Sequence, residues 1–392
     1  MHLFQQGKVV KIVLAPDSFK ESLSALEVAT ALEVGIRRVP PAVECVKVPM
    51  ADGGEGTVDA LVAATGGRYH YKSVMGPLGE RVRARYGLLG DGKTAVIEMA
   101  AASGLPLVPA TKRNPLKTTS FGTGELIRAA LSKGARRIII GLGGSATNDG
   151  GAGMAQALGI RLRDTHGRVL ADGAAGGMLH RIHSLDLAQR IDDLNGAEIL
   201  IACDVQNSLV GKMGASAVYG PQKGANTTQV AELDKKLRHF GRLIEHDLGI
   251  KVLGLAGGGA AGGLGAGLVA FAGGQLRSGV ELVIDAVGLV DHLTHADLII
   301  TGEGRIDAQT AFGKTVAGVA AAAVQMQIPV VALGGGLADD ARKVFSIGID
   351  ALESAIVRDV DLAIAMKYAK KYVRDAGERI AKWIVLGRKM AP

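Results

Sequence analysis

Glycines and short polar side chains alternate between Ile138 and Gly153, where the sequence reads IIIGLGGSATNDGGAG. Because glycine adopts positive φ angles and leaves backbone N–H groups accessible, such a turn accommodates a phosphate or a carboxylate. A helix starting near Ala152 would add its own unpaired N–H groups and its dipole. The residues expected to contact the anion are Gly143, Gly144, Ser145, Thr147 and Asn148. The alternative is a tight strand-to-helix turn in which Asp149 caps the helix.

Charged and other polar side chains also follow three predicted strands. They are Asp17, Ser18 and Lys20 after the apolar run Val9–Leu14, Asp52 and Glu55 after Glu44–Val48, and Glu303, Arg305 and Asp307 after Leu298–Thr301. In open parallel sheets, ligands bind outside the carboxyl ends of the strands. We therefore expect these residues on one rim, although each taken singly is also compatible with an ordinary surface charge.

Acids, glycine-rich loops and a few cations indicate phosphoryl transfer assisted by a hard cation. The sequence contains neither an HExxH metal motif nor a GxSxG nucleophile elbow. The stretch Ala308–Thr315 (AQTAFGKT) fits a Walker A pattern except for its first glycine. Since a P-loop follows its strand directly and we expect this strand to end near Thr301, we do not interpret the pattern as a P-loop.

Apolar periodicity predicts an α/β protein. A capping box at Ser24–Glu27 opens a helix that ends near Arg38. Further helices are expected at 57–65, 122–133, 152–158, 230–248 and 315–325, and strands at 94–99, 137–141, 198–203, 281–284, 329–333 and 349–352. Alternation within Arg68–Leu89 predicts antiparallel strands. The βα alternation returns after Asp297, so one open domain is expected from both chain ends, with an insertion from about Tyr71 to Gly288.

Bulk composition narrows the class of protein. The 392 residues include 56 glycines, one Trp and seven Phe, and the formal net charge is +7. Scattered cations with few stacking aromatics argue against nucleic-acid binding. No apolar leader or membrane-length stretch is visible, and Cys45 and Cys203 lie far apart in apolar runs. We expect a cytoplasmic protein with reduced cysteines and no membrane partner, and leave homo-oligomerisation open.

From about Val9 to Gly387, the chain closely resembles the bacterial glycerate kinase family of the two-domain type that includes the glycerate 2-kinases. The resemblance rests on KIVLAPDSFKESLSALEVA, PMADGGEGTVDALVAATGG, GLGGSATNDGGAGM, CDVQN, YGPQKGA, GGGAAGGLGAGL and DLIITGEGRIDAQT. Two departures are small. Asn207-Ser208-Leu209 stands where the family usually has Asn-Pro-Leu, and Tyr219 replaces the usual Phe.

The resemblance implies ATP-dependent phosphorylation of D-glycerate, with Mg²⁺ on the nucleotide and 2-phosphoglycerate favoured over the 3-isomer as product. It also implies a flavodoxin-like (Rossmann-like) parallel-sheet domain from residues 1–70 and 289–392, an inserted α/β domain from residues 71–288, and an active-site cleft between them.

We assign roles to individual residues as hypotheses, from their places in these motif loops and at strand ends. Asp204 is the leading candidate for the general base or a magnesium ligand, and Lys20 and Arg305 are candidates for carboxylate or phosphate contact. Substrate contacts are expected from Asp17, Ser18, Asp52, Glu55, Asn207 and Lys223, and metal contacts from Asp149, Glu303 and Asp307. The loop at Gly143–Asn148 is expected to cradle phosphate.

Two alternatives remain open. One is a kinase for another small hydroxy acid, such as a tartronate-like or tetronate-like substrate, because one methylene changes discrimination by only about 1–3 kcal/mol. The other is a non-catalytic module that binds a nucleotide or a sugar acid.

Overall fold

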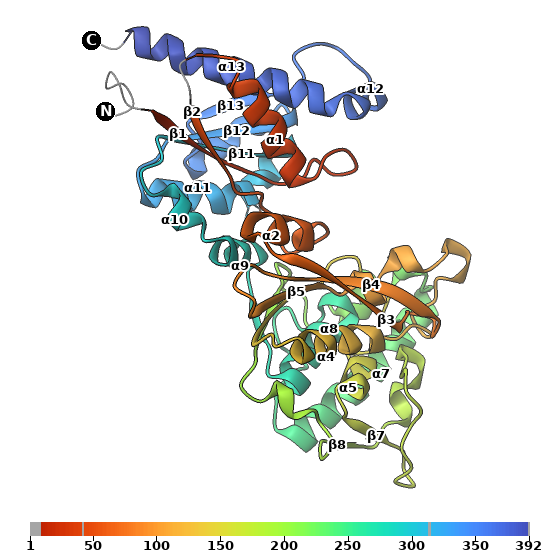
Figure 1. Cartoon of the computed structure of the whole chain (residues 1–392). Coiled ribbons are helices and arrows are strands. Elements are labelled where there is room, and N and C mark those ends of the chain that lie inside the picture. Colours follow the sequence, from red (N-terminus) through yellow and green to blue (C-terminus); the bar gives the residue numbers. More distant parts are fainter. Residues whose placement is uncertain (1–8, 41–42, 313–314, 391–392) are drawn as a thin grey trace. The chain divides into compact units, whose positions relative to one another are not determined.

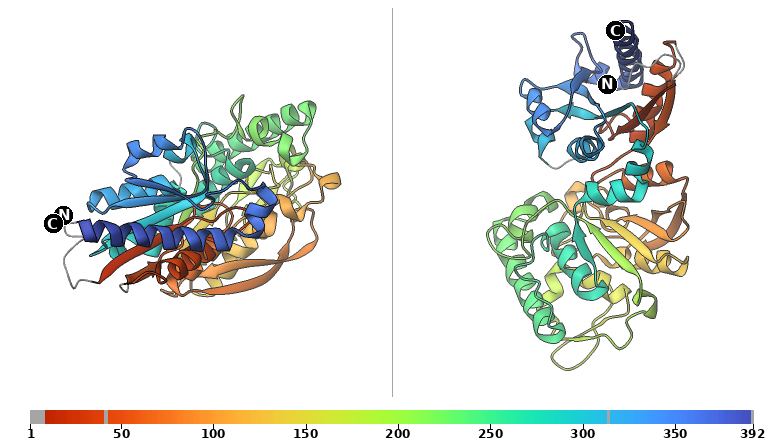
Figure 2. Two further views of the ribbon diagram at one scale, coloured as in Figure 1. Left: turned by 90° about the horizontal axis from the view of Figure 1, so that it is seen from above. Right: turned by 90° about the vertical axis from the view of Figure 1, so that its left-hand side faces the viewer.

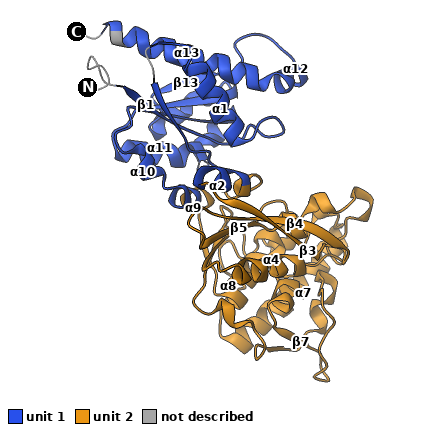
Figure 3. Cartoon of the chain, viewed as in Figure 1, with its two compact units in different colours: residues 1–52, 59–65, 283–392 blue, residues 53–58, 66–282 orange. Residues whose placement is uncertain are grey.

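The computed structural model describes residues 9–40, 43–312 and 315–390. The chain divides into two compact units (Figures 1 and 3). Unit 1 comprises Met1–Asp52, Asp59–Thr65 and Val283–Pro392, and unit 2 comprises Gly53–Val58 and Gly66–Leu282. Both ends of the chain therefore belong to unit 1.

Unit 1 is built on a five-stranded, fully parallel sheet. Its strands lie in the order β13 (Ala351–Ser354), β12 (Val330–Leu337), β11 (Leu298–Ile306), β1 (Val10–Pro16) and β2 (Val43–Lys47). If β1, β2, β11, β12 and β13 are renumbered 1 to 5, the order read from β2 is 2-1-3-4-5, which is the flavodoxin order. Its switch point lies between β1 and β11. The flavodoxin-like parallel sheet expected from both chain ends is confirmed.

Two helices pack together on this sheet and illustrate how the sequence shapes the unit. Helix α1 (Ala25–Ile36) begins at the expected capping box, in which Ser24 Oγ accepts from Glu27 N and Glu27 Oε2 accepts from Ser24 N. It lies alongside α13 (Ala369–Met390), as Figure 2 shows. A Cβ on Gly35 would lie 1.9 Å from the Arg374 carbonyl oxygen, so the close crossing requires glycine.

Unit 2 contains a mixed six-stranded sheet. Its strands lie in the order β10 (Gln275–Arg277), β9 (Glu198–Ala202), β6 (Arg137–Gly141), β5 (Thr94–Glu98), β4 (Arg81–Leu88) and β3 (Arg68–Met75). The first four strands are parallel, whereas β3 and β4 are antiparallel. The register aligns Glu98, Gly141, Ala202 and Arg277 at one carboxyl edge. A small antiparallel pair joins β7 (Arg161–Arg163) to β8 (Ser184–Asp186).

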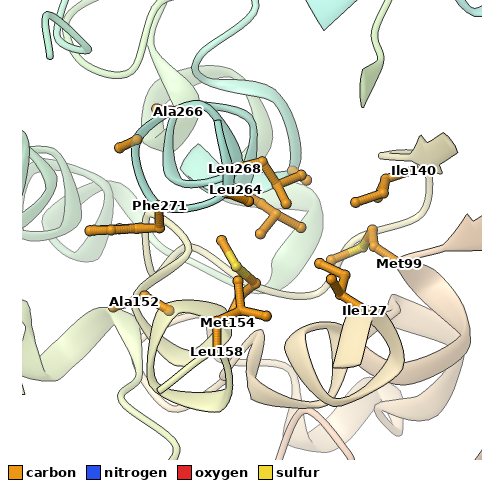
Figure 4. Close-up of a cluster of buried hydrophobic side chains, with 14 of the residues drawn as sticks. Met99, Ile127, Ile140, Ala152, Met154, Leu158, Leu264, Ala266, Leu268 and Phe271 are labelled. Carbon is orange, nitrogen blue, oxygen red and sulfur yellow. The ribbon is translucent and has the colours of Figure 1, made fainter. Parts of the chain in front are cut away.

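Helices pack an apolar core in unit 2 (Figure 4). Met154 of α5 (Ala152–Ala157), Ile127 of α4 (Phe121–Ser132) and Leu264 of α8 (Ala260–Ala272) are fully buried there. Among the described residues, the other α-helices are α2 (Thr57–Thr65), α3 (Ala100–Ser103), α6 (Ala215–Tyr219), α7 (Thr227–Leu248), α9 (Gly279–Val287), α10 (Leu289–Leu293), α11 (Thr315–Gln325) and α12 (Leu362–Lys367).

Three expectations from the sequence were wrong. The strand predicted at 281–284 is part of helix α9. Strand β11 continues to Ile306 and β12 to Leu337, so the expected loops at 302–306 and 334–336 are strand. The boundary expected after residue 70 falls inside β3, which pairs along its length with β4 in unit 2.

Candidate functional site

The loop after β1 is tightly closed at the carboxyl edge of unit 1. Phe19 N donates to Leu23 O at 2.8 Å, and Leu23 N donates to Phe19 O at 2.9 Å. The short turn that results exposes Lys20 and holds Glu21 at a φ of 61°. An ammonium group is thus carried on a constrained turn next to the switch point of the sheet.

Asp17 is held by hydrogen bonds from two parts of the chain. Its carboxylate accepts from Ser18 N at 2.6 Å and from the Thr315 hydroxyl at 2.5 Å. Burial raises the pKa of Asp17, the Thr315 hydrogen bond lowers it, and the neighbouring Asp52 carboxylate raises it further, with a net increase. The site therefore has a carboxyl group that is protonated more readily than an exposed aspartate.

The extended pair β11–β12 positions three further charged residues. Side chains alternate along a strand, so Glu303 and Arg305 lie on the same face of β11. Glu303 Oε1 accepts from the Thr310 hydroxyl at 2.7 Å. Beyond the strand, Asp307 caps the 3₁₀ turn Ala308–Ala311 by accepting from Gln309 N.

Glycine is required where these two strands approach. A Cβ on Gly302 would lie 2.1 Å from Leu333 O, and one on Gly335 would lie 2.4 Å from Gly304 O. Because β11 extends to Ile306, the Walker-like pattern follows the end of its strand almost directly, which changes its interpretation. Its first residues form a 3₁₀ turn rather than an open loop. Gly313 and Lys314 lie outside the described residues.

A pocket of about 640 Å³ opens among these elements of unit 1. Its polar lining includes Asp17, Ser18, Lys20, Asp52, Glu303, Arg305 and Asp307. Its other wall is largely apolar and comes from the ends of β12 and β13 and from helices α12 and α13. The pocket thus reaches the switch point between β1 and β11, where flavodoxin-like sheets bind ligands.

The glycine-rich loop of unit 2 follows β6 at the carboxyl edge of its own sheet. Gly143 and Gly144 are exposed, and Gly144 has a φ of 70°. Within the described part of the chain, the N–H groups of these two glycines have no hydrogen-bond partner. Accessible, unpaired N–H groups on a fixed backbone are suited to binding an anion.

The polar side chains of this loop point into the protein. Ser145, Thr147, Asn148 and Asp149 are all buried. The Asp149 carboxylate accepts from Ser120 N at 2.8 Å, Ser120 Oγ at 2.7 Å, Gly151 N at 3.2 Å and Gly153 N at 3.3 Å. Complete burial raises the pKa of Asp149, although these hydrogen bonds act in the opposite direction. In this conformation the carboxylate organises the loop and does not reach the surface.

Lys223 lies beneath the same loop and is 1% exposed. Its Nζ donates to the Thr147 carbonyl at 2.7 Å. Burial lowers the pKa of Lys223 to about 7, against the opposing attraction of the Asp149 carboxylate. The lysine is therefore a support of the loop backbone in this structure.

The second glycine run packs directly against the first. A Cβ on Gly262 would lie 1.9 Å from Thr147 O, and one on Gly263 would lie 2.8 Å from Gly150 Cα. Gly150 N donates to Gly262 O at 3.0 Å. The two glycine-rich motifs thus form one backbone-to-backbone interface that holds the loop.

Asp204 and Asn207 follow β9 at this edge. Asp204 is exposed, and its Oδ1 accepts from Gly279 N at 2.9 Å, where α9 begins. Asn207 donates from Nδ2 to Met213 O and accepts from the Tyr219 hydroxyl at 2.7 Å. Asp204 therefore has an exposed carboxylate, whereas both polar atoms of Asn207 have partners within its loop.

Glu55 is exposed on a turn that packs on the same edge. A Cβ on Gly53 would lie 2.7 Å from Ala202 Cβ. Glu98 Oε1 accepts from Val58 N at 2.9 Å near the start of α2. The sequence-predicted residues thus fall into two groups, one in unit 1 and one, with Glu55, Asn148, Asp204 and their neighbours, in unit 2.

The residues predicted to bind metal come from different units. Asp149 belongs to unit 2, whereas Glu303 and Asp307 belong to unit 1. Among the described residues, no three His, Cys, Asp or Glu side chains are grouped so that they could hold a metal ion. Mg²⁺ usually needs only one or two carboxylates, together with waters and substrate phosphates. Asp17 and Asp52, which both line the pocket, fit that smaller requirement.

Sequence reasoning missed several supporting residues. Thr315, Thr310 and Ser120 fix the Asp17, Glu303 and Asp149 carboxylates. Of these three residues, only Thr315 was marked by a sequence motif, because it ends the Walker-like pattern. No sequence motif marked the apolar wall from α12 and α13, since the residue pattern of these segments is that of ordinary amphipathic helices. None of the helices in the described ranges is both long and apolar enough to cross a membrane.

The strand orders and the two carboxyl edges define a two-unit α/β protein with anion-binding features in each unit. Residues 12–385 match the glycerate kinase family, and the chain belongs to that family. It is 50% identical to the glycerate 2-kinase of Escherichia coli K12, over 97% of this chain and 100% of that protein. It is 51% identical to the glycerate kinase of Bacillus subtilis 168, over 97% and 99%.

A solved structure shows the same relationship. A Salmonella typhimurium LT2 protein assigned as glycerate kinase 2 is 53% identical to this chain, and its structure matches with a TM-score of 0.89. The match covers 97% of this chain and 100% of that one. The resemblance inferred from the motifs is therefore confirmed at the level of the family.

Proposed function

We propose that this chain is a glycerate kinase that transfers the γ-phosphoryl group of Mg·ATP to the 2-hydroxyl of D-glycerate. Membership of the glycerate kinase family across residues 12–385 carries this proposal. The name of the Escherichia coli relative, glycerate 2-kinase, supports the 2-hydroxyl as acceptor. The exposed amides of Gly143 and Gly144 and the cations of the unit 1 pocket supply binding groups for anionic substrates.

In the proposed reaction, the 2-hydroxyl oxygen of glycerate forms a bond to the γ-phosphorus as the bond to the β,γ-bridging oxygen breaks. ADP leaves with the electron pair of that bond, and the hydroxyl proton passes to a general base. Asp204 is our candidate for the base, because its carboxylate is exposed at the carboxyl edge of unit 2. Bound magnesium would neutralise phosphate charge, with Asp17 and Asp52 as its candidate protein ligands.

The remaining residues take binding or supporting roles in this proposal. Gly143 and Gly144 hold a phosphate group through backbone N–H groups, and Lys20 and Arg305 contribute positive charge. Ser145, Thr147, Asn148, Asp149 and Lys223 support the loop from below, because they are buried. Glu303 and Asp307 position the strand end and the 3₁₀ turn next to Arg305.

The test is ADP release from Mg·ATP with D-glycerate, with L-glycerate as the control and the product resolved by phosphorus NMR. We expect ADP and 2-phosphoglycerate in equal amounts with the D-isomer. Formation of 3-phosphoglycerate alone would retain the kinase and overturn the choice of hydroxyl. Transfer only to a different hydroxy acid would overturn glycerate as the substrate, and binding without ADP release would overturn the catalytic proposal.

A further inference from the structure

The pocket of unit 1 is much larger than a three-carbon acid requires. Its volume of about 640 Å³ lies within the range of roughly 300–1,000 Å³ that is typical of sites for larger organic ligands. Glycerate carries a carboxylate and two hydroxyl groups on a short chain. It would leave most of this pocket unfilled.

The chemistry of the pocket wall also differs from that of glycerate. Ile356, Met366 and Tyr372 contribute apolar surface, and they come from three different segments of the chain. Tyr372 is 6% exposed, and its hydroxyl accepts from Arg358 Nη2 at 2.9 Å, which holds the side chain in place. Such a wall would gain little from a small polar acid, but it would bury the faces of a heteroaromatic base.

The rim of this wall carries exposed apolar side chains. Leu337, at the end of β12, is 41% exposed, and Leu362, in the first turn of α12, is 75% exposed. Both side chains line the pocket. A flat apolar group in the pocket would cover part of this surface.

The other end of the pocket is charged. Lys20 stands on the closed turn after β1, and Arg305 stands on the extended end of β11. In the described residues, the Arg305 guanidinium has no hydrogen-bond or ion-pair partner, which leaves it available to a ligand. Gly335 and Gly336 also line the pocket, and glycine lets a ligand approach the backbone closely.

The apolar wall matches the base of a nucleotide, and Lys20 and Arg305, beside the carboxylates proposed to hold magnesium, match its Mg²⁺-bound phosphates. We propose that this pocket binds the nucleoside of ATP, with the base against Ile356, Met366 and Tyr372 and the phosphates towards Lys20 and Arg305. The assignment rests on the proposed function only in taking ATP as the phosphoryl donor. It makes unit 1 the nucleotide-binding unit.

Gly336 offers a direct way to fill the pocket. A Cβ placed on Gly336 meets no atom within 4 Å, and its φ is not in the left-handed region, so Gly336→Phe introduces a ring without backbone strain. Gly254→Phe is the matched control, because Gly254 is equally open and lies outside the pocket in unit 2. Isothermal titration with Mg·ADP and steady-state kinetics for both substrates are measured on the full chain.

We expect Gly336→Phe to weaken Mg·ADP binding by at least about tenfold, while the KM for D-glycerate stays within about twofold. Gly254→Phe should match the wild type. Unchanged ADP affinity in Gly336→Phe, or a rise in the KM for glycerate alone, would overturn the assignment.

Leu362→Glu provides a second variant that leaves the core untouched, because Leu362 is on the surface of α12. It should weaken Mg·ADP binding by about threefold to tenfold, whereas Leu386→Glu on the exposed face of α13 should have no effect. If ADP binding responds to both pocket variants but wild type transfers no phosphoryl group, the proposed function fails and the pocket assignment stands. If wild type transfers the phosphoryl group normally but both pocket variants keep their ADP affinity, the pocket assignment fails and the proposed function stands.

Discussion

The carboxyl edges of the two sheets present anion-binding groups in different ways. In unit 1, charged side chains such as Lys20 and Arg305 stand in the open and line a pocket. In unit 2, the polar side chains of the glycine-rich loop are buried, and the exposed groups at Gly143 and Gly144 are backbone amides. One edge therefore presents charged side chains, and the glycine-rich loop at the other presents backbone N–H groups.

The difference predicts how each edge responds to mutation. An exposed cation contributes little to folding, so its removal should change ligand binding and leave stability almost unchanged. Removing a buried polar group that supports the backbone should mainly lower stability, because its hydrogen-bond partners are left unsatisfied. Asp204 is an informative exception, since it is an exposed side chain on the edge of unit 2.

Asp204→Asn should have the largest effect on activity. Removing a general base lowers kcat by about 10²–10⁴-fold. Asparagine is as good a helix cap as aspartate, so it should still accept from Gly279 N and keep the start of α9 intact. Coupled ADP-release kinetics and thermal unfolding, measured on the same preparation, give the two quantities.

Asp204→Ala is the control for the capping role. It removes both the carboxylate and the cap, so it should lose the same activity and also about 1 kcal/mol of stability. A near-normal kcat in Asp204→Asn would remove Asp204 from the chemical step.

Lys223→Met tests the support beneath the loop in unit 2. The variant removes the donor to Thr147 O and leaves that buried carbonyl unpaired. We expect the free energy of unfolding to fall by about 2 kcal/mol at pH 9, measured by urea denaturation. An unchanged free energy of unfolding would show that the loop does not depend on this lysine.

The same variant has a characteristic pH dependence. Burial lowers the pKa of Lys223 from 10.5 to about 7 in the folded chain. Between these two values the unfolded chain binds the extra proton, so the Lys223 contribution to stability increases as pH rises, by at most about 1.4 kcal/mol per unit. The stability difference between wild type and Lys223→Met should therefore widen from pH 7 to pH 9. A constant difference would contradict the lowered pKa.

Arg305→Gln tests the opposite behaviour in unit 1. Because the guanidinium is exposed on the end of β11, we expect kcat/KM to fall by about tenfold and the free energy of unfolding to change by less than about 0.5 kcal/mol. Arg342→Gln, at another arginine of unit 1 outside the pocket, is the matched control. Loss of stability without loss of activity in Arg305→Gln would reverse the contrast between the two edges.

Local sequence signals predicted the elements that local interactions build. The capping box at Ser24–Glu27 marked the start of α1, and the apolar runs marked β1 and β6. The rule that ligands bind at strand carboxyl ends then gathered Asp17, Lys20 and Arg305, which line one pocket. These predictions needed no knowledge of contacts between distant residues.

Distant contacts account for what could not be predicted. The segment 281–284 reads equally as a short strand or a helix, and the α9 start is capped by Asp204 from 75 residues away. Gly334–Gly336 read as a turn, but close packing against β11 makes glycine suitable for a strand there. Lys223 donates to the carbonyl of Thr147, which is 76 residues distant, so its supporting position was not visible in the sequence.

The smallest effect on activity is expected for Tyr219→Phe, which restores the residue usual in the glycerate kinase family. The change removes only the hydrogen bond from the Tyr219 hydroxyl to Asn207 Oδ1, while Asn207 Nδ2 can still donate to Met213 O. The free energy of unfolding should fall by about 1 kcal/mol, and kcat/KM should stay within about twofold. A tenfold loss of kcat/KM at unchanged stability would instead mean that Asn207 contacts substrate, so that a second side chain at the edge of unit 2 takes part in the reaction beside Asp204.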